Sequence, residues 1–160
     1  MRPLLTRAAA LIGATALLAS CATTENTQTW NVSAVYADPA VAMPDGMAGS
    51  TIFLMSDKHM VGQDVCGGFQ AKVNVTDSSG KKVALTDESA ASVSFSELTA
   101  QDANCDGQNL YVHLKIVSLI NGEYEVIHQP TSDGYTMVTL TRQANADDPT
   151  SKEGFQLICG

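Results

Sequence analysis

The sequence has few cysteines, few aromatic residues and few basic residues. Its 160 residues include 4 cysteines and one tryptophan, and 9 lysines and arginines stand against 17 aspartates and glutamates. Because proteins bind nucleic acid by neutralising phosphates with cationic side chains, the net charge of −8 argues against a nucleic-acid partner. The same acidity argues against an electrostatic attachment to anionic lipid headgroups.

Motifs that identify common enzymes and metal sites are also absent. The sequence has no Gly-Lys-Ser phosphate loop, no Gly-x-Ser-x-Gly elbow and no paired-histidine zinc motif. His59, His113 and His128 have no second candidate ligand close by, so we interpret them as surface or strand residues. Catalysis by a Cys66 or Cys159 thiolate would need a nearby base, which the sequence does not indicate. We therefore expect no catalytic activity, no metal and no cofactor.

Acidic residues offer one minor alternative, a calcium site. The acidic pairs at residues 87–88 and 147–148 lack the alternate spacing of an EF-hand loop, so we interpret them as solvated loop charge. Asp102, Asn104 and Asp106 do place oxygen atoms at alternate positions. A weak calcium site there stays open as a hypothesis.

The first twenty residues have the composition of an export signal. Arg2 and Arg7 supply the positive start, and an apolar run follows over residues 8–19. This run is shorter than the roughly 20 residues that a membrane-spanning helix needs. We therefore expect residues 1–20 to be a removed signal peptide, and we exclude them from the fold prediction.

The end of this signal, Leu18-Ala19-Ser20-Cys21, resembles the lipobox of bacterial lipoproteins. The resemblance implies cleavage before Cys21 and a diacylglycerol thioether on its sulfur, with acyl chains that hold the protein to a membrane. Ala22, rather than Asp, favours the outer membrane of a Gram-negative host. The expected location is the cell envelope, with the protein anchored in the outer membrane and facing the periplasm. The alternative is an ordinary cleaved signal followed by an unmodified cysteine.

Removal of the signal leaves 140 residues with a net charge of −10, which is the size of one compact domain. Residues 22–29 have no apolar periodicity, so we expect residues 21–29 to be the lipidated cysteine and a flexible tether. The domain is expected to begin at Trp30 and to cover residues 30–160. Within it, residues 143–153 form a second weakly patterned segment.

Short β-branched or aromatic runs alternate with turn signals along the domain. The predicted strands cover residues 30–36, 51–55, 69–75, 92–98, 124–128, 135–141 and 155–159. Residues 110–120 fit the period of a helix and that of a strand, and the residues alone do not decide between them. The pattern favours a β-rich α+β fold, an antiparallel sheet curled towards a barrel with one packed helix.

Three cysteines remain after Cys21, an odd number for an oxidising compartment. Cys66, Cys105 and Cys159 can form at most one internal bridge. In the chain-entropy model a loop of about 40 residues is worth roughly 4 kcal/mol, and Cys66–Cys105 and Cys105–Cys159 differ by only about 0.3 kcal/mol. Loop entropy therefore leaves both pairings open.

Several segments resemble the META domain of HslJ-like envelope lipoproteins. The order of that family is followed by Trp30-Asn-Val, Thr51-Ile-Phe-Leu, Met60-Val-Gly, Val65-Cys66-Gly-Gly-Phe69 and Leu98-Thr, with Cys105 downstream. The resemblance covers residues 30–142. It departs from the family at Gly67-Gly68, where an Asn-Arg pair is usual, and Cys159 lies outside the pattern.

The resemblance implies a barrel-like META fold, a helix over residues 110–120 and a Cys66–Cys105 disulfide. Cys159 would then be an extra thiol, free or bridging to a partner. It also implies a stress-related or virulence-related accessory role. We therefore expect a non-catalytic envelope lipoprotein, held to the membrane by its lipid, that binds another envelope protein. The alternative is a lysozyme-inhibitor or immunity lipoprotein whose acidic domain binds a basic hydrolase through electrostatic steering.

Overall fold

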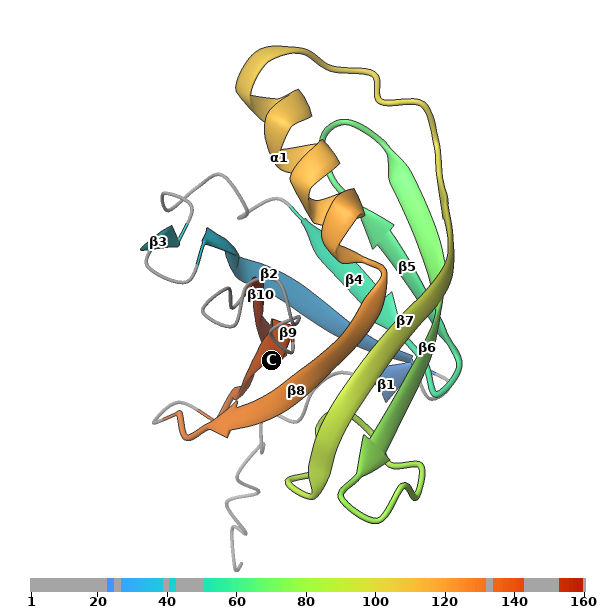
Figure 1. Cartoon of the computed structure of the whole chain (residues 1–160), viewed down its shortest axis with the longest axis vertical. Helices are drawn as coiled ribbons and strands as arrows, with labels where there is room; N and C mark the ends of the chain where they lie inside the picture. The colour runs from blue at the N-terminus through green and yellow to red at the C-terminus, as the bar shows by residue number, and fades with distance from the viewer. Residues whose placement is uncertain are drawn as a thin grey trace, which may run out of the picture.

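A computed structural model describes residues 23–24, 27–38, 41–42, 51–131, 134–142 and 153–159. Within this part of the chain, eight strands form one closed antiparallel barrel that carries one helix (Figure 1). Around the barrel the order is β2-β10-β9-β8-β7-β6-β5-β4, and pairing of β4 with β2 closes the ring. The expected β-rich fold, curled towards a barrel with one helix, is confirmed.

Seven of the barrel strands were predicted, and one was not. The barrel strands are β2 (Thr27–Asp38), β4 (Ile52–Met55), β5 (His59–Gln63), β6 (Gly68–Asp77), β7 (Ala90–Ala100), β8 (Gly122–Gln129), β9 (Thr136–Arg142) and β10 (Gly154–Cys159). The short strands β1 (Thr23–Thr24) and β3 (Val41–Ala42) pair with β2 outside the ring. The sequence did not indicate β5, because its five residues include a glycine and two polar side chains.

Strand β2 begins three residues before the domain boundary expected at Trp30. Gln28 and Thr29 pair with Met55 and Leu54 of β4, so residues 27–29 belong to the barrel and not to a tether. The sequence does not indicate that these residues belong to the strand, because their side chains are polar. Backbone hydrogen bonds alone can hold such a strand edge. The predicted signal peptide, Cys21 and residues 143–152 lie outside the described residues.

Alternate side chains of the strands fill the barrel, as the period of a half-buried strand requires. On β6 the buried side chains are Phe69, Ala71, Val73 and Val75, the face predicted from the sequence. The aromatic side chains at the centre meet edge to face. The Phe53 ring centroid lies 5.9 Å from that of Phe69 and 5.6 Å from that of Phe155.

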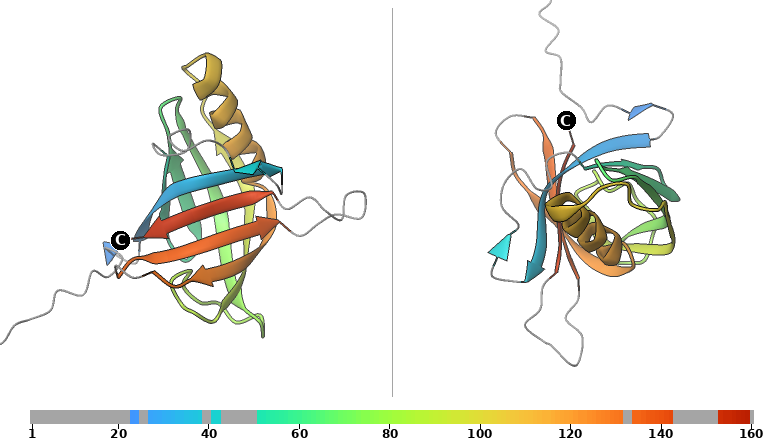
Figure 2. Two further views of the ribbon diagram at one scale, coloured as in Figure 1. Left: turned by 90° about the vertical axis from the view of Figure 1, so that its left-hand side faces the viewer. Right: turned by 90° about the horizontal axis from the view of Figure 1, so that it is seen from above.

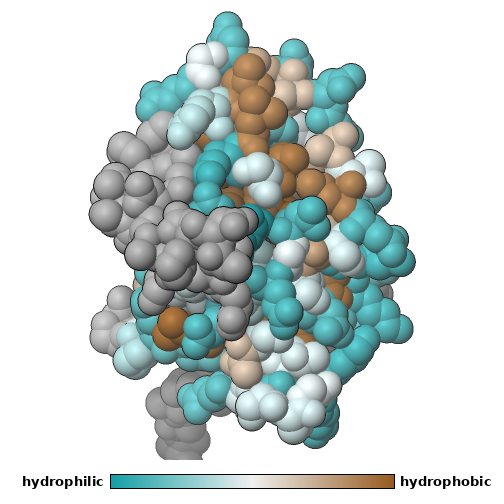
Figure 3. Space-filling view, viewed as in Figure 1, coloured by the Kyte–Doolittle hydropathy of each residue, from teal (hydrophilic) through white to brown (hydrophobic). Residues whose placement is uncertain are grey.

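Helix α1 (Gly107–Leu119) lies across one end of the barrel (Figures 1 and 2). Val112, Ile116 and Leu119 recur at helical spacing and are buried, which explains why residues 110–120 form a helix and not a strand. Tyr111 and Leu114 lie on the opposite side and are exposed. The space-filling view accordingly shows hydrophobic surface where α1 lies (Figure 3).

Arg142 of β9 fixes the end of α1 to the barrel. Its Nη2 donates hydrogen bonds to the carbonyl oxygens of Asn121 (2.6 Å) and Leu119 (3.3 Å) and to the hydroxyl of Tyr124 (3.0 Å). The Tyr124 hydroxyl in turn donates to the Leu119 carbonyl. Glu153 accepts from Arg142 and, at 2.9 Å, from Lys115 on the helix. These bonds satisfy carbonyl groups that a helix leaves unpaired at its C-terminus.

No helix in the described ranges combines the length and the apolar composition that crossing a membrane would require.

Candidate functional site

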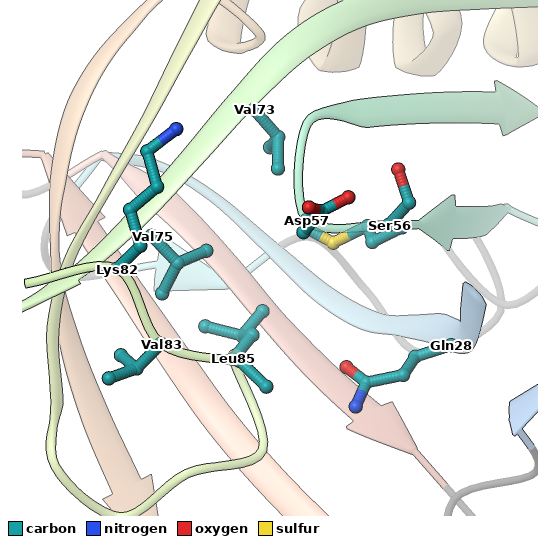
Figure 4. Close-up of a pocket in the computed structure, with 10 residues that line it drawn as sticks. Gln28, Ser56, Asp57, Val73, Val75, Lys82, Val83 and Leu85 are labelled. Atoms are coloured by element: carbon teal, nitrogen blue, oxygen red, sulfur yellow. The ribbon is translucent and has the colours of Figure 1, made fainter. Parts of the chain in front are cut away.

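The barrel has a cavity at the end away from α1 (Figure 4). Its volume is about 420 Å³. The lining comes from β2, the β4–β5 turn, the second half of β6 and the chain that follows β6. The lining residues are Gln28, Met55, Ser56, Asp57, Val73, Val75, Lys82, Val83, Ala84 and Leu85. We call this space the end cavity.

The end cavity has an apolar wall and a polar rim. In Figure 4, Val75 lies near Val83 and Leu85 on one side, Ser56 and Asp57 lie together on the other, and Val73 and Gln28 lie above and below the space between them. Lys82 adds a positive charge at the rim, and Asp57 adds a negative one. Apolar walls with a few polar groups are typical of sites that bind small molecules.

The chain over residues 78–89, which we call the end loop, folds across this end of the barrel. Its middle is tied to three strands. The Val83 N–H donates to the Val75 carbonyl (3.2 Å), Gln28 Nε2 donates to Thr86 Oγ1 (2.9 Å), and His128 Nε2 donates to the Leu85 carbonyl (3.0 Å). Leu85 is consequently buried although it lies in a loop. The end loop therefore forms one wall of the cavity.

Two aspartates hold the turns at the ends of this loop. The Asp77 carboxylate accepts bonds from the Ser79 hydroxyl and from the N–H groups of Ser79 and Lys81. The Ser79 hydroxyl, followed by the Lys81 N–H, lowers the pKa of Asp77 below its ordinary 3.8. Bonds from the N–H and the hydroxyl of Ser89 lower the pKa of Asp87 in the same way. Asp87 is exposed, as predicted for a solvated loop charge, and it also stabilises a turn through its bonds to Ser89.

A disulfide between Cys66 and Cys105 lies at the other end of the barrel. It joins the β5–β6 connection to the segment before α1, with 5.0 Å between the two Cα atoms. This is the pairing that the META resemblance implied. Cys66 is buried and Cys105 is half-buried.

His113 of α1 is buried beside this disulfide, which corrects the interpretation of it as a surface or strand residue. Its Nδ1 lies 2.8 Å from Asp64 Oδ2, and the two side chains are only 3% and 5% exposed. Asp64 Oδ1 also accepts the N–H groups of Cys66 (2.8 Å) and Gly67 (3.1 Å). The sequence missed this pair because its members are 49 residues apart and meet only when the helix covers the barrel.

Within the described ranges, one group of three His, Cys, Asp or Glu side chains lies close enough to share a metal ion. It consists of Asp64, Cys66 and His113. The Cys66 sulfur is held in the disulfide, and a metal needs a thiolate. In the oxidised protein the group is therefore a buried hydrogen-bonded pair, Asp64 and His113, beside a disulfide. Asp102 and Asp106, the predicted calcium alternative, are exposed and do not join such a group.

The remaining predicted site residues fall in different places. Cys159 is buried at the end of β10 and is disulfide-bonded, so of the two expected alternatives, a free thiol or a bridge to a partner, the free thiol is not found. His59 is exposed on β5, and His128 contacts the end loop. Catalysis by Cys66 would first require its disulfide to open. Cys21 lies outside the described residues.

No protein-family model, curated protein or solved structure matches the chain. The resemblance to the META domain therefore stays a prediction.

Proposed function

We propose that this protein is a non-catalytic binding protein of the bacterial cell envelope that takes a small amphipathic molecule into the end cavity. The observation that carries the proposal is the cavity of about 420 Å³ at one end of a closed barrel. Small-molecule sites commonly measure about 300 to 1,000 Å³, and the mouths of β-barrels are a frequent place for them. The META resemblance adds a stress-related or virulence-related role.

The lining determines the kind of ligand. Val73, Val75 and Leu85 are each less than 7% exposed, and they offer a wall that favours an apolar chain or ring. The polar end of the ligand would meet the rim, where Lys82 and Asp57 carry opposite charges. The rim therefore suits a ligand headgroup of positive or negative charge. The lining specifies only that the rest of the ligand is apolar.

Titration with the apolar fluorescent dye N-phenyl-1-naphthylamine tests this function. We expect saturable binding to one site per chain, with a blue-shifted and brighter emission because the dye leaves water. Dodecanoate and dodecylammonium, which differ in headgroup charge, should then compete with the dye, and their relative strength identifies the preferred sign. Emission that rises without saturation, or that neither competitor reduces, would reject a built site.

The proposal places this barrel outside the cytoplasm on a lipid attached to Cys21. The support is the lipobox at residues 18–21, which lies outside the described residues. A sulfur that carries a thioether to diacylglycerol cannot also form a disulfide. Since Cys66 and Cys105 pair with each other, a bridge from Cys159 within one chain would require the sulfur of Cys21. A lipidated Cys21 therefore requires Cys159 to pair with a cysteine of another chain.

Mass spectrometry of the protein from its membrane decides between these two uses of Cys21. The proposal expects an acylated N-terminal peptide, labelling by an alkyne analogue of palmitate, and loss of the label in Cys21→Ser. A peptide in which Cys21 is joined to Cys159 would contradict the anchor. The matched control is Cys105→Ser, which alters another cysteine and should keep the label.

A second candidate is a lysozyme-inhibitor or immunity lipoprotein, and the net charge of −8 favours it. An acidic domain would attract a basic hydrolase most strongly at low ionic strength. Inhibition of purified lysozyme should then fall as salt is added. No inhibition at low salt would exclude lysozyme as the target and leave the end cavity as the site of function.

A further inference from the structure

Three side chains with metal-binding atoms converge where the β5–β6 connection meets α1, and a fourth, Cys105, adjoins them. The donor atoms of Asp64, Cys66 and His113 lie within 4.8 Å of one another, and all three residues are more than 90% buried. The Cys105 sulfur lies outside this group of three, but it is bonded to the Cys66 sulfur and therefore adjoins the group. Two sulfurs, one imidazole and one carboxylate make a donor set that zinc accepts.

We propose that reduction of the Cys66–Cys105 disulfide opens a binding site for a zinc-class divalent ion, formed by Asp64, Cys66, Cys105 and His113. In the reduction the S–S bond accepts two electrons and two protons and gives two thiols. The ion then displaces both thiol protons, while Asp64 binds as a carboxylate and His113 as a neutral imidazole through Nδ1, with its proton on Nε2. The electrons come from a dithiol reductant in the cell or from a phosphine in the test tube.

The existing geometry is near what the ion needs. Bond lengths of about 2.0 to 2.3 Å in a tetrahedral zinc site place neighbouring donors roughly 3.3 to 3.8 Å apart. The spread of 4.8 Å among the donors of Asp64, Cys66 and His113 is thus within about 1 to 1.5 Å of that arrangement, and Cys105 has to approach once the S–S bond is open. Asp64 Oδ2 and His113 Nδ1 already lie 2.8 Å apart, and an ion would take the place of the proton between them.

The surroundings of Asp64 favour the bound state. Its Oδ1 is fixed by the N–H groups of Cys66 and Gly67, so the carboxylate is oriented before an ion arrives. Burial strengthens the attraction between the ion and the negative ligands, because little water screens it. The disulfide therefore occupies part of a site whose other ligands are already in position.

A reductant can reach the disulfide from the side of Cys105. Cys66 is only 3% exposed, whereas Cys105 is half-buried in residues 101–106, which form no helix or strand. Attack at the Cys105 sulfur releases Cys66 as the leaving thiolate beside His113. A reductant thus reaches the bridge at Cys105, and the Cys66 thiolate is released next to the buried ligands.

Cobalt titration of the purified protein tests the site, since Co²⁺ replaces Zn²⁺ and reports its ligands by absorption. With the protein reduced by tris(2-carboxyethyl)phosphine under argon, we expect one Co²⁺ per chain, with the intense visible bands of a tetrahedral site and a thiolate charge-transfer band. Zn²⁺ should remove these bands. The oxidised protein should show none of them.

Variants identify the ligands. Cys105→Ser should abolish the charge-transfer intensity expected of two thiolates, and Asp64→Asn or His113→Asn should weaken Co²⁺ binding by at least about tenfold. His59→Asn, an exposed histidine on β5, is the matched control and should leave binding unchanged. The proposal is overturned if the reduced protein binds no Co²⁺, whether it stays folded or unfolds. It is equally overturned if binding survives in the Cys66→Ser, Cys105→Ser double variant.

Discussion

The imidazole of His113 and the carboxylate of Asp64 lie 2.8 Å apart with almost no exposure to water, one on the helix and one on the barrel. Asp64 Oδ1 also accepts hydrogen bonds from the backbone N–H groups of Cys66 and Gly67. This contact therefore joins the helix, the β5–β6 connection and the disulfide in one polar cluster. The pair thus holds α1 on the barrel together with the Arg142 contacts at the other end of the helix.

Removing one member of this pair should destabilise the protein strongly. We expect His113→Ala to lower the free energy of unfolding by about 3 kcal/mol, because it leaves the Asp64 carboxylate buried and unpaired. Urea unfolding followed by circular dichroism measures the change. His59→Ala removes an exposed histidine and should change the free energy by less than about 0.5 kcal/mol. Equal values for the two variants would mean that the pair carries no stability.

Opening the disulfide should weaken the whole domain, because it closes a loop of 39 residues. For the Cys66→Ala, Cys105→Ala double variant the chain-entropy model gives a loss of about 4 kcal/mol in the free energy of unfolding. The measurement is urea unfolding of both proteins without reductant. With reductant and a metal chelator present, the wild type should lose most of its advantage. If the two proteins unfold at the same urea concentration without reductant, the bridge does not act as described.

Stability should fall in alkali because of Tyr124. Burial raises the pKa of this hydroxyl to about 12, and the nearby Arg142 guanidinium opposes the rise. The neutral form is thus favoured in the folded state, so its contribution is complete below the unfolded pKa of about 10 and is lost as the pH rises from 10 to 12. At about 1.36 kcal/mol per pKa unit, the loss amounts to roughly 2 to 3 kcal/mol.

The Tyr124→Phe variant separates this effect from general alkaline damage. At neutral pH it should lose about 1 kcal/mol, since its bonds to the Leu119 carbonyl and to Arg142 disappear. Between pH 10 and 12 its stability should decline less steeply than that of the wild type. Tyr111→Phe alters an exposed ring and serves as the control. Parallel pH curves for wild type and Tyr124→Phe would contradict the assignment.

The barrel should not tolerate a side chain at Gly62. A Cβ atom there would lie 1.8 Å from Phe69 Cε2, because the Phe69 ring lies over its cross-strand partner Gly62. We expect Gly62→Ala to destabilise by about 1 to 3 kcal/mol through forced movement of a packed ring. Gly68→Ala is the matched control, since its Cβ would meet only the mobile ends of Gln63 and Gln101. Thermal unfolding should rank Gly62→Ala well below Gly68→Ala.

Local patterns predicted most of the barrel, because its strands bury alternate side chains. The Phe69 to Val75 face is an example: four apolar residues at a spacing of two can only share one side of a strand. Strand β5 was not predicted, because Gly62 stands at a position where a strand would have an inward side chain. The Phe69 ring fills the space that this side chain would take. A glycine that leaves room for a neighbour carries no local signal of a strand.

The candidate sites were much harder to predict, because they depend on contacts between distant parts of the chain. Val73 lies in a predicted strand and Leu85 in none, and only the path of the end loop brings the two side chains to one cavity. The Asp64–His113 pair likewise depends on where α1 lies. The Cys66–Cys105 pairing came from a family resemblance, since loop entropy alone did not distinguish it from Cys105–Cys159.

Filling the end cavity with a large side chain shows whether ligand binds there. Ala84 is exposed at its rim, so Ala84→Trp should block the opening and leave the core intact. Ala100→Trp places the same ring at an exposed position beside Phe69, near the other end of β6. The measurement is the affinity for N-phenyl-1-naphthylamine. We predict that Ala84→Trp weakens it by at least about tenfold and that Ala100→Trp leaves it within about twofold. Equal affinities in both variants and the wild type would contradict the account.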